Sequence, residues 1–404
     1  MQNRSSEKNI LVCAVCILAA LSLCLGGFFV ILSPTGAANG TLPEGLGDAE
    51  SFFVRAGSSK NLSLSAKSAI LIEVGSGEAI LSKDPDTRMP MASTTKIMTA
   101  LVAIENCELD RTVTVSADAT NIEGSSIYLY EGEQMTMLDL LYAMLLESAN
   151  DAAAAIAIEV GGSVEGFAAL MNEKAVALDL SDTHFENPHG LDANTHYTTA
   201  RELAIIAREA YRNQTLREIF STYKRTIPMG QGDGVRLLIN HNKLLKNYEG
   251  ATGIKTGYTK KSGRCLVSAA ERDGLAFIAV TLNSPDDWSD HKKMLDMGFE
   301  CYESRRLCSA GEQVYTLPTV GSVEDHVTLA AARDISVVIE RGAGKVECVV
   351  DLPRFVYAPV KKGEVVGHLE FYLEGNLIAT TELIALECAS ARREKGIFER
   401  IFGG

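Results

Sequence analysis

The sequence predicts two folded parts, a mixed α/β part followed by a small all-β part. Two observations predict the first part: short β-rich runs paired across glycine turns, and longer runs with apolar residues at helical spacing. A third predicts the second part: beyond Gly311 short runs rich in valine, isoleucine and threonine alternate with glycine, proline and charged residues. With 404 residues, 46% of them hydrophobic, the chain can bury two cores.

The first part is expected to begin and end with β structure. The stretches AILIEV (69–74) and EAILS (78–82) are predicted to pair as a hairpin across a glycine-rich turn. GIKTGYT (253–259) is predicted to be a strand, and residues 264–283 a second hairpin that turns at an Asp-Gly pair. A closing helix is expected over 286–303.

Four helices are expected between these strands. The first includes the end of MASTTKIMTA (91–100), and the second begins at Thr136, with Asp139 in the place of a capping-box acid. The third covers 151–160, where a run of alanines indicates burial on nearly all sides. The fourth starts at Thr199 and is amphipathic.

The N-terminus combines basic residues with a long apolar run. Arg4 and Lys8 precede the apolar residues 10–32, and small residues around Ala37 fit a cleavage site. We therefore expect residues 1–38 to be a signal peptide, or an N-terminal membrane segment if they stay uncleaved.

The remaining domain limits follow from composition. Residues 39–62 are predicted to be a linker, 63–305 the mixed α/β domain and 306–388 a β-rich domain. Residues 389–404 place basic residues opposite isoleucine and phenylalanine, which is typical of an amphipathic helix at a membrane surface; a frayed tail is the alternative.

The net charge and the spacing of the cysteines limit the classes of ligand that the chain is expected to bind. The formal net charge is −14 at pH 7, so no basic footprint favours nucleic acid. The six cysteines beyond the N-terminal segment show no paired-ligand spacing. We expect no cofactor and no metal, and Cys301 with Cys308 is a weak candidate for a disulfide.

Ser93 and Lys96 place a hydroxyl and an amine three residues apart at the start of a helix. Residues i and i+3 share one helix face, so the amine can reach the hydroxyl. A buried, unprotonated lysine can take the proton of an attacking serine, and helix N-terminal N–H groups favour the negative charge that develops. Alone, this pattern also fits a capping serine beside an exposed lysine.

Two further motifs make the pattern specific. Ser148 and Asn150 lie between two apolar helices, where packing requires neither side chain. Lys255-Thr256-Gly257 lies in a predicted strand, where a lysine is costly unless an anion meets it. Gly257 lets a substrate lie against the strand.

In this order, S-x-x-K, S-x-N and K-T-G resemble the motifs of the penicillin-recognising serine enzymes. The stretches LDLLYAMLLESANDAAAAIA and FENPHGLDANTHYTTARELAIIA are similar to the low-molecular-weight penicillin-binding proteins, the serine D-alanyl-D-alanine carboxypeptidases. The likeness covers 63–305 and implies a serine β-lactamase/DD-peptidase-like domain, an antiparallel sheet with helices on both faces. Residues 312–385 resemble the family's small β-sandwich domain and 389–404 its C-terminal amphipathic helix.

The resemblance implies three catalytic residues. Ser93 would be the acyl nucleophile, Lys96 its base, and Ser148 the relay of a proton to the leaving D-alanine. The backbone N–H groups of Ser93 and Tyr258 would form the oxyanion hole.

The resemblance also implies the substrate-binding residues. Asn150 would hold the substrate amide, while Lys255 and Thr256 would grip its terminal carboxylate beside Gly257. His241 stands where some relatives carry an arginine near this carboxylate, and a purely structural role for it stays open.

The implied partner is a peptidoglycan stem peptide ending in D-Ala-D-Ala, with β-lactams as inhibitors. The enzyme would be exported to the outer face of the bacterial cytoplasmic membrane and would contact the membrane surface through its terminal segments.

Three alternatives follow from the same residues. A serine β-lactamase needs a carboxylate that activates water, for which Glu186 is the candidate. A metallopeptidase could use His184, His189, His196 and Asp192, although their spacing forms no helical ligand pair. A catalytically inactive wall-binding protein is the third.

Overall fold

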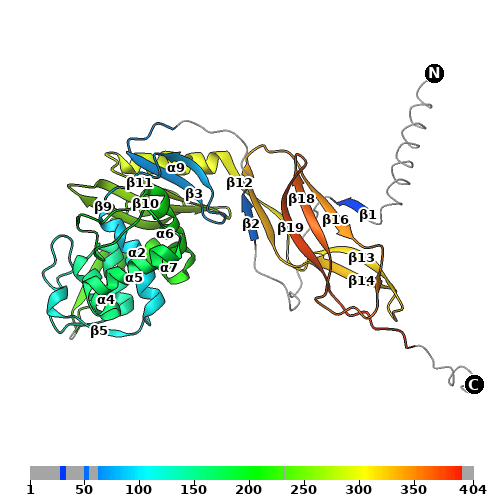
Figure 1. The fold of residues 1–404 in the computed structure, drawn as a ribbon, viewed down its shortest axis with the longest axis horizontal. Coiled ribbons are helices and arrows are strands. Elements are labelled where there is room, and N and C mark those ends of the chain that lie inside the picture. The colour runs from blue at the N-terminus through cyan, green and yellow to red at the C-terminus, as the bar shows by residue number, and fades with distance from the viewer. Residues whose placement is uncertain (1–27, 33–49, 54–61, 231–232, 394–404) are drawn as a thin grey trace, which may run out of the picture. The chain divides into compact units, whose positions relative to one another are not determined.

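The computed structural model describes residues 28–32, 50–53, 62–230 and 233–393. Its contacts divide the chain into two compact units (Figure 1). The first, called here the catalytic unit, is Gly57–Tyr302. The second, the β unit, combines Glu303–Gly404 with Met1–Ala56.

A five-stranded antiparallel sheet forms the centre of the catalytic unit, in the order β4-β3-β11-β10-β9. Both predicted hairpins and the predicted K-T-G strand are therefore confirmed, and β9 lies at the sheet edge. The strands are β3 Ser68–Glu73, β4 Ala79–Lys83, β9 Ala251–Thr259, β10 Gly263–Arg272 and β11 Leu275–Leu282.

Helices cover both faces of this sheet (Figure 1), as expected. On one face α9 packs against β10 and β11; on the other, α6 packs against β3 and β11 and α2 packs against α6. The helical elements are η1 Ala92–Thr95, α2 Lys96–Asn106, η2 Ala117–Ala119, α3 Met137–Leu146, α4 Asn150–Gly161, α5 Val164–Ala177, α6 Ala200–Arg212, α7 Gln214–Ser221, α8 Leu244–Asn247 and α9 Asp287–Cys301.

Side-chain caps fix the starts of the helices. The N–H of Asp139 donates to the Thr136 hydroxyl at 3.1 Å, which confirms the predicted start of α3. The predicted start of α6 is also confirmed, because Thr199 caps it. Helices α5 and α7, which the sequence analysis left unassigned, begin at the capping residues Ser163 and Asn213.

Two small strand pairs extend the catalytic unit beyond the predicted elements. One pairs β5 (Thr112–Thr114) with β6 (Gln134–Thr136), and the other pairs β7 (Lys224–Pro228) with β8 (Val235–Ile239). The second pair leads directly into the segment before α8, which contributes to the cavity described below.

The β unit contains a seven-stranded sheet, in the order β1-β16-β18-β19-β14-β13-β17, and a three-stranded sheet, β12-β15-β2. This confirms the predicted all-β second part. The strands are β1 Phe28–Leu32, β2 Glu50–Phe53, β12 Tyr302–Cys308, β13 Gln313–Val320, β14 His326–Ala331, β15 Ile335–Glu340, β16 Val346–Leu352, β17 Val356–Tyr357, β18 Val365–Leu373 and β19 Asn376–Ala385.

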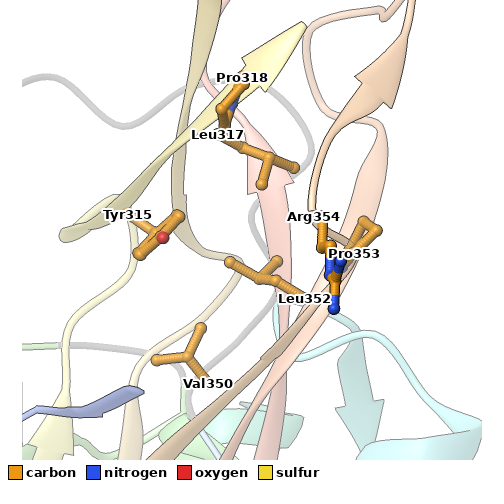
Figure 2. A pocket seen from close by; sticks show the side chains of 7 residues that line it. All are labelled: Tyr315, Leu317, Pro318, Val350, Leu352, Pro353 and Arg354. Carbon is orange, nitrogen blue, oxygen red and sulfur yellow. The ribbon is translucent and has the colours of Figure 1, made fainter. Parts of the chain in front are cut away.

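A small cavity of 170 Å³ opens in the β unit, between β13 and the end of β16 (Figure 2). Its lining includes the buried apolar side chains Leu317 and Val350. Tyr315, Pro318 and Arg354 are among the other side chains around it (Figure 2).

The terminal segments are described only in part. Strand β1 falls within the expected leader 1–38 and pairs with β16, and β2 falls within the expected linker 39–62 and pairs with β15. The amphipathic helix expected over 389–404 lies outside the described residues from 394 onward. Cys301 and Cys308 are free thiols.

Within the described ranges, no single helix has the length and hydropathy to cross a bilayer. Among these described helices, only the pair α4 and α5 taken together has the required length and hydropathy, and the chain bends by 80° between the two.

Candidate active site

Ser93 and Lys96 lie at the junction of η1 and α2, where the sequence predicted a shared helix face. The Lys96 Nζ lies 3.1 Å from the Ser93 Oγ, within hydrogen-bond distance. The turn that carries Ser93 is 3₁₀ rather than α, and it begins with Ala92, whose φ is +48°. The pair therefore meets the geometric requirement for a serine and its base.

Lys96 is completely buried, which determines its protonation. Among the described residues, its Nζ contacts two neutral acceptors besides Ser93: the Asn150 Oδ1 at 2.7 Å and the His189 carbonyl at 2.6 Å. Burial lowers the pKa of Lys96 well below its usual value, and the nearby charge of Lys255 lowers it further, against the carboxylate of Asp151. A lysine in this environment can act as a neutral proton acceptor.

Asn150 begins α4, and both ends of its side-chain amide are occupied. Its Oδ1 accepts from Lys96, and its Nδ2 donates to the carbonyl of Glu123 at 2.5 Å. The loop comes this close because Gly124 has no Cβ; one added there would lie 2.8 Å from the Asn150 Nδ2. In this arrangement Asn150 positions Lys96, and its expected contact with the substrate amide stays a prediction.

Ser148 lies in the short connection between α3 and α4. Its backbone adopts φ = +59°, an uncommon conformation for a residue with a side chain. The residue is buried but reaches the same cavity as Ser93. Such a conformation next to a nucleophile is common in functional sites.

Lys255 lies in β9 and is also buried. Burial lowers its pKa to about 7, and its Nζ donates to the Thr256 carbonyl at 3.0 Å. At neutral pH the group is therefore divided between its charged and neutral forms. Lys255 and Lys96 are close enough for the charge of one to lower the pKa of the other.

Gly257 brings β9 against the turn of the nucleophile. A Cβ at this position would lie 3.0 Å from the Ser93 nitrogen and 3.1 Å from the Thr94 nitrogen, tighter than nine in ten Cβ contacts in proteins. The absence of a side chain therefore sets the distance between the strand and Ser93.

Gly257→Ala is expected to reduce the rate at which a fluorescent penicillin acylates Ser93 by about 10-fold to 100-fold, because the strand must move away from the nucleophile. Gly344→Ala in the β unit is the control, since its Cβ would meet nothing closer than 3.9 Å. An equal rate in both variants would contradict the role of this close approach.

One cavity of 380 Å³ joins these elements. It brings together the sequence-predicted residues Ser93, Ser148, Thr256, Gly257 and Tyr258. The other three predicted residues, Lys96, Asn150 and Lys255, are buried and do not line it. The remaining lining residues are Ser125, His241, Lys243, Arg264, Asp287 and Trp288.

Five of these lining residues were missed in the sequence analysis. Ser125 comes from the loop that also holds Asn150, Lys243 from the start of α8, and Arg264 from β10. Asp287 and Trp288 begin α9, and Asp287 forms a 2.9 Å ion pair with Arg264. Only Trp288 carried a signal, because it is the single tryptophan of the chain.

His241 reaches the cavity wall and lies 3.3 Å from the carboxylate of Glu147. Burial and the charge of Lys255 lower its pKa, and Glu147 opposes this shift. The contact fits a structural role and leaves the substrate role possible, so both interpretations stay predictions.

The residues behind two of the alternatives lie outside this cavity. The Glu186 carboxylate accepts hydrogen bonds from the backbone and hydroxyl of Thr195 and does not line the cavity. The His196 ring bonds to the Thr95 hydroxyl at 2.8 Å, and burial lowers its pKa to about 4. In the described part of the chain, no three His, Cys, Asp or Glu residues are grouped so that they could hold a metal ion.

Comparisons with known proteins identify the relatives of this chain. The D-alanyl-D-alanine carboxypeptidase family model (peptidase family S11) matches residues 55–286, and that of the penicillin-binding protein 5 C-terminal domain matches 302–389. D-alanyl-D-alanine carboxypeptidase DacF of Bacillus subtilis is 32% identical over 80% of this chain and 85% of its own length. DacA of Escherichia coli is 31% identical over 80% of this chain and 83% of its own.

Solved structures show the same likeness. Penicillin-binding protein 5 of Haemophilus influenzae superposes with a TM-score of 0.65 at 27% identity, over 82% of this chain and all of that one. The chain therefore belongs to the family of serine D-alanyl-D-alanine carboxypeptidases, peptidase family S11.

Proposed function

We propose that Ser93, Lys96 and Ser148 carry out the carboxypeptidase reaction on peptidoglycan stem peptides that end in D-Ala-D-Ala. The observation that carries this assignment is the 3.1 Å approach of the fully buried Lys96 amine to the Ser93 hydroxyl; in the part of the chain that the structure describes, this amine contacts no carboxylate. A neutral lysine at that distance can accept the hydroxyl proton as the oxygen attacks.

Acylation then follows from the arrangement of the cavity. The Ser93 oxygen attacks the carbonyl carbon of the penultimate D-alanine, and its proton passes to Lys96. The backbone N–H groups of Ser93 and Tyr258 stabilise the negative charge on the carbonyl oxygen. Lys96 then gives this proton through the Ser148 hydroxyl to the leaving nitrogen, the C–N bond breaks, D-alanine departs, and the acyl group stays on Ser93 beside a neutral Lys96.

Deacylation reverses these proton transfers with water as the nucleophile. Water attacks the ester carbonyl and gives a proton to Lys96, and Lys96 passes this proton to the departing Ser93 oxygen, which restores the hydroxyl and the neutral amine. A β-lactam would acylate Ser93 in the same way, and we propose that its ester is hydrolysed slowly. Glu186, the candidate for activating water in a β-lactamase, is engaged with Thr195 instead.

We also propose that the chain is exported and works at the outer face of the cytoplasmic membrane. The basic and apolar pattern of residues 1–38 supports export, and that of 389–404 supports a membrane contact. The domain limits at 62, 305 and 388 remain part of this proposal.

Purified protein is expected to release D-alanine from an acylated peptide ending in D-Ala-D-Ala and to bind a fluorescent penicillin covalently. Ser93→Ala is expected to lose both, because the attacking oxygen is gone. D-alanine is measured with a coupled oxidase assay, and the label by gel fluorescence.

The same measurements separate the alternatives. Rapid turnover of penicillin would indicate a serine β-lactamase. If the unmodified protein neither binds the fluorescent penicillin nor releases D-alanine, it is an inactive wall-binding protein.

A further inference from the structure

A carboxypeptidase must recognise the free carboxylate at the end of its substrate, which requires a cation that reaches the cavity. Lys255 was the sequence-based candidate for this cation. In the structure it is only 2% exposed, its Nζ is engaged by the Thr256 carbonyl, and it does not line the cavity. A different cation is therefore needed at the cavity wall.

Three basic side chains line the cavity: His241, Lys243 and Arg264. His241 faces Glu147 at 3.3 Å, and Arg264 pairs with Asp287 at 2.9 Å, so each already has an anionic partner. Among the described residues, no carboxylate lies within ion-pair distance of Lys243, which is exposed. Lys243 therefore supplies the uncompensated positive charge of the wall.

Trp288 holds this charge in place. The Lys243 Nζ lies 6.0 Å from the centre of the Trp288 ring, and the Arg264 guanidinium lies 5.8 Å from it. An ammonium over an indole face is attracted to it, and this contact limits the rotation of the lysine side chain. Such a restraint lowers the entropy lost when the lysine binds an anion.

The location also fits the reaction. Lys243 lies at the start of α8, which packs against β9, and Thr256 of β9 lines the same cavity. A carboxylate there can accept a hydrogen bond from the Thr256 hydroxyl on one oxygen and from an ammonium on the other. The indole of Trp288 provides an apolar surface for a small side chain such as a methyl group.

We propose that Lys243, restrained by Trp288, binds the terminal carboxylate of the substrate and thereby restricts the enzyme to peptides with a free C-terminus. This inference rests on the proposed function, and it assigns the carboxylate to Lys243 in place of the buried Lys255.

Lys243→Gln tests this role in the full-length enzyme with two substrates, an acylated D-Ala-D-Ala peptide and its C-terminal amide. For the free acid, kcat/KM is expected to fall about tenfold, mainly through KM, because a hydrogen bond to a charged group is lost. For the amide, kcat/KM is expected to stay unchanged. Lys246→Gln is the matched control: Lys246 lies in α8, three residues after Lys243, and its Nζ lies over an aromatic ring, 3.9 Å from the centre of the Tyr223 ring, but it does not line the cavity.

Equal losses on both substrates would overturn the proposal, because they would indicate a general disturbance of the site. No loss on the free acid would overturn it as well. If the unmodified enzyme released no D-alanine, the proposed function itself would fail. A normal unmodified enzyme with an insensitive Lys243→Gln variant would refute only the role of Lys243.

Binding can be measured without turnover in Ser93→Ala, because Trp288 is the only tryptophan of the chain. Its fluorescence is expected to change when the free-acid peptide binds. The dissociation constant of this peptide is expected to be about tenfold higher in the double variant Ser93→Ala/Lys243→Gln than in Ser93→Ala. The amide peptide should bind both variants equally. If the fluorescence of Trp288 did not change at saturating concentrations of the free-acid peptide, this result would contradict the placement of the carboxylate.

Discussion

Lys96→Gln is expected to slow the acylation of Ser93 by penicillin about 10³-fold, which is the usual contribution of a general base. Glutamine retains a polar group that can contact Asn150, but it cannot take a proton from Ser93. The measurement is the second-order rate of labelling by a fluorescent penicillin. The control is Lys174→Gln, which removes a lysine of α5 whose partner Glu105 is at 2.6 Å, remote from the cavity lining.

The pH dependence checks the same base in the unmodified enzyme. Acylation requires neutral Lys96, so the rate should rise with pH as the group loses its proton. Because burial lowers the pKa of Lys96 well below its usual value, this rise is expected far below the pH at which a free lysine titrates. In Lys96→Gln the acylation rate should no longer rise with pH. If this variant kept both the acylation rate and its pH dependence, another group would be the base.

Arg236→Ala is expected to destabilise the catalytic unit by about 3–5 kcal/mol, because it leaves a buried carboxylate without its cation. The partner, Glu133, is fully buried, and the two side chains form a bidentate pair. Arg236 also donates to the carbonyl of Ile127 at 3.0 Å, so it ties β8 to the loop beside the active site.

Urea unfolding followed by the fluorescence of Trp288 measures this loss in the catalytic unit. The control is Arg111→Ala, which removes a largely exposed ion pair with Glu159 and should cost less than about 1 kcal/mol. Equal midpoints for the two variants would show that the buried pair contributes no more than a surface pair.

Local signals allowed much of the fold to be predicted. The starts of α3 and α6 are confirmed because Thr136 and Thr199 cap helices through groups three residues away in the sequence. Ser163 is an equivalent signal for α5 and was overlooked. The parallel pairing of β2 with β15 could not be predicted, because it joins segments almost 300 residues apart that carry no shared local pattern.

The same distinction applies to the site. The approach of Lys96 to Ser93 was predictable because one helical turn fixes it. The meeting of Lys243 with Trp288 was not, because α8 and α9 come together only through their packing around the sheet. The S-x-N motif also did not predict that both the oxygen and the nitrogen of the Asn150 side-chain amide are hydrogen-bonded. The carbonyl of Glu123, which accepts from the nitrogen, belongs to a loop without any sequence signal.

Burying two lysine side chains in one site also affects the stability of the protein. The pKa of Lys255 is about 7 in the folded chain against a usual 10.5, so between these values unfolding takes up a proton. Its contribution to the free energy of unfolding therefore rises with pH across this window, and the full penalty applies below about pH 7. The buried Lys255 therefore lowers the stability of the folded protein in neutral surroundings, and mildly alkaline media should restore part of that stability.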